Sequence, residues 1–143
     1  MQTLLLLLRH AESDRDCALA AADLAARTEQ SALAQLHQLV GYRHDYEARW
    51  SGQFSQGGAM ALVHNYREFM ARLSQAVDQQ QRAVLAATAA RDAALRTLRE
   101  RELRVASVAK LIERRSREIH LSGERREQKQ FDDVEKTIQP LLD

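Results

Sequence analysis

Apolar residues recur along this chain at alternating steps of four and three residues, in two long runs. The runs are separated at one place, from Trp50 to Gly58, where three of the five glycines lie. Strict alternation of apolar and polar residues, which is typical of strands, is absent from both runs. The pattern therefore predicts two long helices that fold back on each other.

Each run holds two heptad classes, which we call the seam positions. In the first run they are Leu4, Ala11, Ala18, Ala25, Ala32, Leu39 and Tyr46, with Leu8, Arg15, Ala22, Glu29, Leu36, Arg43 and Trp50. In the second run they are Met70, Val77, Val84, Arg91, Leu98, Val105, Ile112 and Ile119, with the more mixed Tyr66, Leu73, Gln80, Ala87, Ala94, Arg101, Val108 and Arg115. A repeat of 3.5 residues kept over this many heptads predicts a left-handed coiled coil.

The first-run seam is rich in alanine, which lets two backbones approach closely but buries little apolar surface per layer. Arginine and glutamate at seam positions weaken the coil further and can set its register. We therefore expect a modestly stable, pliable coil.

The expected fold is all-α: one elongated two-helix antiparallel coiled coil over residues 1–143, with a longer second helix. Helix 1 is expected over about 3–50, a break over about 51–59, and helix 2 over about 60–138. Beyond about residue 108 helix 2 overhangs without a partner, and Pro140 is expected to end it. All but one of the aromatic residues lie near the break and are expected to pack there. They are Tyr42, Tyr46, Trp50, Phe54, Tyr66 and Phe69.

Net charge is +1 but is unevenly spread. Residues 91–126 carry eleven Arg and Lys against six Asp and Glu, whereas residues 127–143 carry two against five. A basic helical stretch is compatible with nucleic-acid binding, but arginine alternates with glutamate here, which favours a solvated face with ion pairs along the helix. Cys17 is the only cysteine, and no leader or membrane span is recognised, so a cytosolic chain is expected.

Candidate chemistry is sparse. The stretch from Leu4 to Ser13 is similar to the opening of histidine phosphatases, in which an apolar strand delivers an Arg-His pair. That family needs an α/β core and later strands, and nothing after residue 13 has the pattern of a strand. No cluster of His, Cys, Asp or Glu has metal-ligand spacing. We therefore expect no enzyme activity, no catalytic residues, no metal and no cofactor.

One face of helix 2 near the break holds an apolar stripe, Phe69, Leu73, Ala76 and Gln80, at steps of four, three and four residues. The simplest interpretation is that all four pack against helix 1. A binding surface is the alternative.

These residues also carry a resemblance. Tyr42 to Tyr46, the glycine-containing break and the block from Asn65 to Val77 resemble the FliJ family of flagellar type III export proteins. The stretch from Arg126 to Asp133 is similar to the C-terminal signature of that family, and Leu4, Leu8, Ala11, Glu12 and Ala18 have its spacing at the start. The resemblance covers essentially the whole chain.

The resemblance implies a stalk that inserts into the hexameric flagellar export ATPase, promotes its assembly and turnover, contacts the membrane export gate and cycles export chaperones. It assigns Phe69, Leu73 and Ala76 to gate binding, with Gln80 where enteric members have histidine. It assigns Gln128, Lys129, Asp132 and Asp133 to the ATPase ring. A cytoplasmic monomer, peripheral to the inner-membrane export apparatus and without nucleic acid, is implied.

Three other binding functions remain open from the sequence. The stalk of a virulence injectisome has the same architecture and role. A holdase chaperone would need exposed apolar tips and oligomers, and a nucleic-acid-binding coil would show steep salt dependence through residues 91–126.

Overall fold

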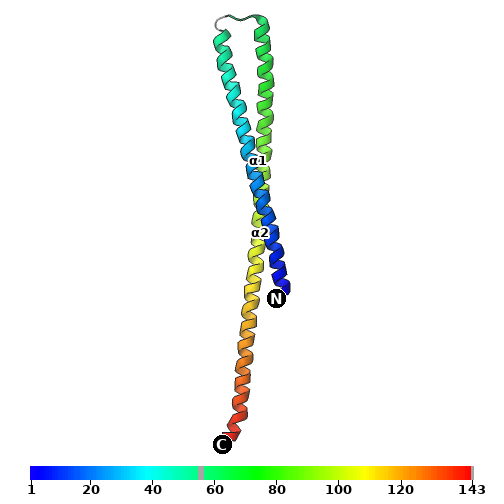
Figure 1. Ribbon diagram of the computed structural model, residues 1–143, viewed down its shortest axis with the longest axis vertical. Coiled ribbons are helices and arrows are strands. Elements are labelled where there is room, and N and C mark those ends of the chain that lie inside the picture. The colour runs from blue at the N-terminus through cyan, green and yellow to red at the C-terminus, as the bar shows by residue number, and fades with distance from the viewer. Residues whose placement is uncertain (55–56, 143) are drawn as a thin grey trace. The chain divides into compact units, whose positions relative to one another are not determined.

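The structure, a computed structural model, describes residues 1–54 and 57–142, and these form two helices and no strand. Helix α1 spans Gln2–Phe54 and helix α2 spans Met60–Leu142, 53 and 83 residues long. The two helices run in opposite directions (Figure 1). The prediction of an all-α, antiparallel two-helix coiled coil with a longer second helix is thus confirmed.

The chain divides into two compact units, which we describe separately. The hairpin unit is Cys17–Leu98 and contains the break. The end unit is Met1–Asp16 together with the α2 residues from Arg99 onward.

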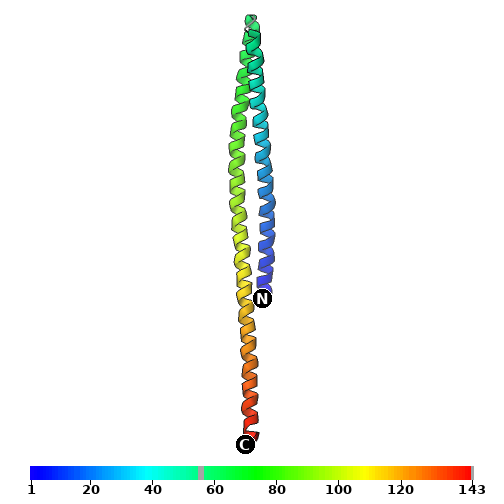
Figure 2. The same ribbon diagram turned by 90° about the vertical axis from the view of Figure 1, so that its left-hand side faces the viewer.

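In the hairpin unit, the seam positions are the packed positions. Ala18, Ala22, Val77 and Ala87 are buried, and every other seam residue between 17 and 98 is buried or half-buried. Figure 2 shows the two helices side by side through this unit. Alternating steps of four and three residues keep one stripe of each helix turned toward the other. This stripe forms a narrow core of small side chains.

The break is shorter than predicted. Helix α1 continues to Phe54, past the expected end near residue 50, because Phe54 still packs on Trp50 and Tyr66. Ser55 and Gln56, part of the predicted break, lie outside the described residues. Gly57 has a φ of 83°, a left-handed conformation that favours glycine, and its N–H donates to the Phe54 carbonyl at 3.2 Å. Gly57 therefore closes the C-terminus of α1.

In the end unit, Ala11 of α1 and Val108 of α2 are buried, and Leu4, Leu8, Val105 and Ile112 are half-buried. Every described side chain from residue 113 to 141 is exposed, and we call this stretch the free segment. The seam residues Arg115 and Ile119 lie in it and are exposed, because no α1 residue of this unit covers them. The heptad pattern of α2 thus continues past its partner helix.

The prediction that Pro140 ends the second helix was wrong, since α2 runs to Leu142 with Pro140 inside it. Proline lacks the N–H that would bond to the carbonyl four residues earlier. So close to the C-terminus this removes only one hydrogen bond of the helix.

Candidate functional site

The turn end of the hairpin unit is held by aromatic side chains from both helices. Trp50 of α1 packs on Tyr66 of α2 with tilted rings whose centroids are 5.4 Å apart, and Phe54 meets Tyr66 edge-on at 5.2 Å. Tyr46 of α1 and Phe69 of α2 make the next layer, at 4.7 Å. Aromatic pairs at such distances add stability beyond their buried area. These contacts hold α1 and α2 together at the turn end of the hairpin unit, next to Phe69.

The stripe Phe69, Leu73, Ala76 and Gln80 lies partly inside the coil. Phe69 is 37% exposed, so one side of its ring packs on Tyr46 while the other faces solvent. Leu73 and Ala76 are half-buried. The structure therefore brings the four residues onto one face, where each contributes both to packing and to surface.

Gln80 is held by hydrogen bonds across the coil. Its side-chain amide donates to the Ala32 carbonyl at 2.9 Å and to Gln35 Oε1 at 3.2 Å. The Ala32 carbonyl belongs to the α1 backbone, so the bond links the two helices directly. A partner that contacts Gln80 must either leave these bonds in place or replace them.

A second polar layer lies further from the turn. Arg91 Nη1 donates to Glu29 Oε1 at 2.7 Å, and Arg91 Nη2 donates to Asp92 Oδ1 at 2.9 Å. Glu29 is only 5% exposed, although it sits among alanines. The hydrogen bond to Asp92 and the charge of Glu29 raise the pKa of Arg91 above its usual value, against an opposing effect of desolvation. The guanidinium of Arg91 therefore keeps its positive charge in this layer.

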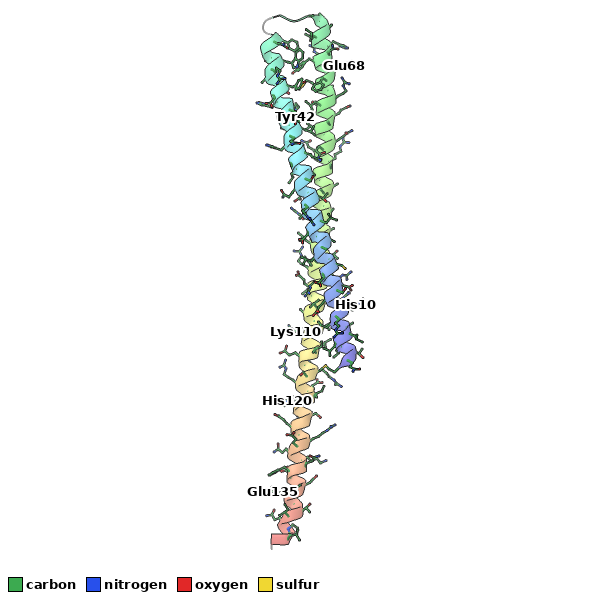
Figure 3. All side chains as sticks on the ribbon, in the orientation of Figure 1. His10, Tyr42, Glu68, Lys110, His120 and Glu135 are labelled. Carbon is green, nitrogen blue, oxygen red and sulfur yellow. The ribbon has the colours of Figure 1, made fainter. Side chains whose placement is uncertain are left out.

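Two residues beside the stripe were not assigned a role from the sequence. Gln35 accepts the bond from Gln80, and Tyr42, labelled in Figure 3, is exposed on the same flank of the coil. The two residues are seven apart on α1, and each comes three residues after a seam position. The heptad register was the signal that could have identified them.

The tail residues Gln128, Lys129, Asp132 and Asp133 all lie in the free segment and are exposed. Figure 3 shows side chains such as His120 and Glu135 projecting from α2 with no second helix beside them. The hydroxyl of Thr137 donates to the Asp133 carbonyl at 2.8 Å, within the helix. The four polar side chains are thus available to a partner.

An apolar stripe shares this segment and was missed from the sequence. It comprises Phe131, Val134, Ile138 and Leu141, which are all exposed. Their steps of three, four and three residues place them on one helix face. They escaped notice because they do not fall on the seam classes that identified the coil.

The basic stretch in the end unit is partly neutralised along its own helix. Arg117 pairs with Glu113 at 3.5 Å, Arg115 with Glu118 at 3.5 Å, and His120 approaches Glu124 at 3.1 Å. Such pairs at three- and four-residue spacing are typical of a solvated helix. They weaken the field that a phosphate backbone would meet.

The phosphatase-like opening lies on α1, so Leu4 to Leu8 form helix rather than the strand which that chemistry needs. His10 is exposed and approaches Asp14, one turn away, at 3.5 Å. Cys17 is exposed as well. Among the described residues, no group of His, Cys, Asp and Glu is arranged to hold a metal ion, and no helix has the length and apolarity to cross a membrane.

Comparison with known proteins agrees with this architecture. The profile of the flagellar FliJ protein family matches residues 1–137. The flagellar FliJ protein of Salmonella typhi is 28% identical over 104 residues, covering 73% of this chain and 71% of that protein. This chain belongs to the FliJ family. It is therefore a flagellar protein related to export, and the match includes both the Phe69 stripe and the tail residues Gln128 to Asp133.

Proposed function

We propose that this FliJ-family chain is a non-enzymatic stalk of the flagellar export apparatus. It inserts into the hexameric export ATPase, promotes ring assembly and turnover, contacts the membrane export gate and cycles export chaperones. The family match over residues 1–137 carries the proposal. It also favours the flagellar apparatus over a virulence injectisome or a general coiled-coil chaperone.

The free segment supports the part of the proposal that concerns the ATPase. A single helix cannot satisfy six identical subunits at once, so its contacts with a ring should be few and individually weak. Exposed polar side chains, with Lys129 and Asp133 one turn apart, suit such contacts. Gln128 and Asp132 lie beside them and act with them.

The Phe69 stripe supports the part that concerns the export gate. Phe69 offers the exposed side of an aromatic ring, and aromatic rings are frequent anchors in protein interfaces. Leu73 and Ala76 extend the apolar surface along the helix, and Gln80 holds the α1 backbone in place beside them. We include Tyr42 in this surface, because it is exposed on the same flank.

In this proposal the chain acts as a monomer in the cytoplasm and associates peripherally with the inner-membrane export apparatus. It requires no cofactor and binds no nucleic acid.

The test is ATP turnover by the flagellar export ATPase of the same organism, with and without the purified chain. Stimulation is expected, and it should be lost when Lys129 and Asp133 are both replaced by alanine. A matched variant in which Lys110 and Glu102 are replaced should still stimulate, because these exposed residues lie outside the free segment. An active ATPase that does not respond to the chain would contradict the stalk function.

Gate contact needs a separate measurement. Binding of the cytoplasmic domain of the export gate protein should weaken when Phe69 is replaced by alanine. Leu85→Ala is the control, because Leu85 is more exposed than Phe69 and lies on another face of α2. Equal loss in both variants would show that Phe69 does not mark the contact surface.

A further inference from the structure

The free segment of the end unit carries an apolar stripe that the proposed ATPase contact does not use. Its four residues follow steps of three, four and three, which is the spacing of a coiled-coil seam over two heptads. Each is between 46% and 82% exposed, although residues of this kind are usually buried. We call the set the tail stripe: Phe131, Val134, Ile138 and Leu141. Among the described residues, no second helix covers it.

The tail stripe and the polar tail residues lie on different sides of the helix. Relative to the heptad that Phe131 and Val134 define, Lys129, Asp132 and Asp133 occupy outer positions, which point away from a partner on the stripe. Gln128 lies between the two sides. A partner on the tail stripe therefore leaves Lys129 and Asp133 accessible to a different protein.

The charged residues that border the tail stripe are acidic. Glu127 falls on the line of the stripe, four residues before Phe131, and Glu135 directly follows Val134 at a flanking position. Glu135 is labelled in Figure 3. The other flanking positions beside the stripe are uncharged, namely Gln128, Gln130 and Thr137. Between residues 124 and 141, no position on the line of the stripe or flanking it is Lys or Arg.

The helix itself does not neutralise these two carboxylates. No Lys or Arg lies three or four residues from Glu127 or from Glu135, the spacings at which side chains of one helix pair. In the part of the chain that the structure describes, neither glutamate forms an ion pair. The lysines of this stretch, Lys129 and Lys136, occupy outer positions, and each lies three and four residues from two aspartates. The negative charge beside the tail stripe is therefore left for a partner to balance.

We propose that the tail stripe binds an amphipathic helix of a partner protein, with an apolar seam and basic residues beside it. The heptad spacing matches a second helix laid along α2, and a helix satisfies its own backbone hydrogen bonds, as an extended peptide would not. The hairpin unit uses the same device, since Glu29 in its seam is met by Arg91 of the opposite helix. Glu127 and Glu135 would be met in the same way by Lys or Arg of the partner.

A second copy of the chain and an anionic surface fit the tail stripe less well. In a parallel pair of tail stripes the two copies of Glu127 would face each other, and in an antiparallel pair centred on the stripe the two copies of Glu135 would. Both arrangements place like charges together. Residues 127–143 carry two Lys against five Asp and Glu, so anionic lipids and nucleic acids would be repelled.

The probe is a synthetic helix of about three heptads, with leucine at its seam positions and lysine at the flanking positions. A second peptide has glutamate in place of every lysine. Binding of each peptide to the full-length protein is measured by fluorescence anisotropy at low salt, where surface charges are least screened. The lysine peptide is expected to bind more tightly than the glutamate peptide, and added salt should weaken its binding.

An isoleucine in the tail stripe and one outside it locate the site. Ile138→Ala should weaken binding of the lysine peptide by about tenfold. Ile119→Ala is the matched control and should bind as the parent does, because Ile119 is exposed to a similar extent on the same helix but lies off the line of the stripe. Circular dichroism verifies that each variant is folded.

Two charge exchanges separate local pairing from net charge. Replacing Glu127 and Glu135 by lysine should reverse the preference between the two peptides. Replacing Asp132 and Asp133 by lysine changes the net charge by the same amount at outer positions, and the lysine peptide should remain the preferred one.

Equal affinity for the two peptides, equal loss in Ile119→Ala and Ile138→Ala, or the same response to both charge exchanges would overturn the proposal. So would self-association of the protein, seen by sedimentation and abolished by Ile138→Ala, because the occupant would then be a second copy. Binding to anionic vesicles that depends on Ile138 would overturn it as well. None of these outcomes depends on ATPase stimulation, so the helix-binding site and the stalk function fail separately.

Discussion

Glu29 of α1 and Arg91 of α2 form an ion pair across the hairpin unit, with Oε1 and Nη1 2.7 Å apart. Glu29 is buried, whereas Arg91 reaches solvent in part and also holds Asp92. The pair forms one polar layer in a largely apolar seam. A shift of one helix by a heptad would leave the Glu29 carboxylate buried without its partner, so the pair fixes the register.

Replacing Arg91 by alanine should therefore destabilise the hairpin by removing the partner of a buried carboxylate. We expect the melting temperature, followed by circular dichroism, to fall by about 5–10 °C. Replacing both Glu29 and Arg91 by leucine should restore or raise it, because the apolar pair buries no charge. A double variant as unstable as Arg91→Ala would show that the charge of Glu29 is not the cause.

Trp50→Ala should loosen the turn end of the hairpin. Trp50 contacts both Phe54 and Tyr66, and it is half-buried. Because Trp50 is only half-buried, we expect its replacement to lower the free energy of unfolding, measured with urea, by about 2 kcal/mol, which is less than for a fully buried tryptophan. The exposed Tyr42 is the control, and Tyr42→Ala should change stability by less than about 0.5 kcal/mol. Comparable losses in both would mean that the aromatic layers contribute little.

Val77→Ala tests the narrow core. Val77 is 1% exposed, the most buried large side chain among the described residues. Deleting its methyl groups should cost about 1–2 kcal/mol in the free energy of unfolding. Val134→Ala, made in the exposed free segment, should be close to neutral. If both variants unfold as the parent does, the seam is not the source of stability.

Replacement of two glycines by alanine should change local stability in opposite directions. A side chain at Gly123 would meet no atom within 4 Å, so Gly123→Ala should stabilise its helix by about 0.5–1 kcal/mol. Gly57 has a φ of 83°, and Gly57→Ala should destabilise the turn. Amide hydrogen exchange measures both effects, as slower exchange around residue 123 and faster exchange near residue 57. The same sign at both sites would contradict this account.

The heptad pattern predicted the packed positions wherever α1 and α2 lie against each other, but it also continues over Arg115 and Ile119, which are exposed. Every seam position from Leu4 to Trp50 and from Tyr66 to Ile112 is buried or half-buried. It could not predict which residues lie opposite each other, because a repeat has the same appearance in every register. The pairing of Glu29 with Arg91, and of Gln80 with Ala32, required the structure.

The candidate binding surfaces, too, were predicted only in part from the sequence. Phe69, Leu73, Ala76 and Gln80 were found as a stripe because their steps follow the helix period. The hydrogen bonds of Gln80 depend on the opposite helix and could not be inferred. Phe131, Val134, Ile138 and Leu141 were missed because they leave the seam classes where α2 has lost its partner. Phe54 was expected beyond the helix because the glycines around it suggested an earlier end.

The chain has one cysteine and one tryptophan, and both lie in the hairpin unit. Cys17 is exposed near the open end of the unit, and Trp50 is packed between aromatic rings at its closed end. A dye attached to Cys17 would report on partners that approach the open end. Tryptophan emission from Trp50 would report independently on the turn. The native sequence thus allows two-site fluorescence without a single substitution.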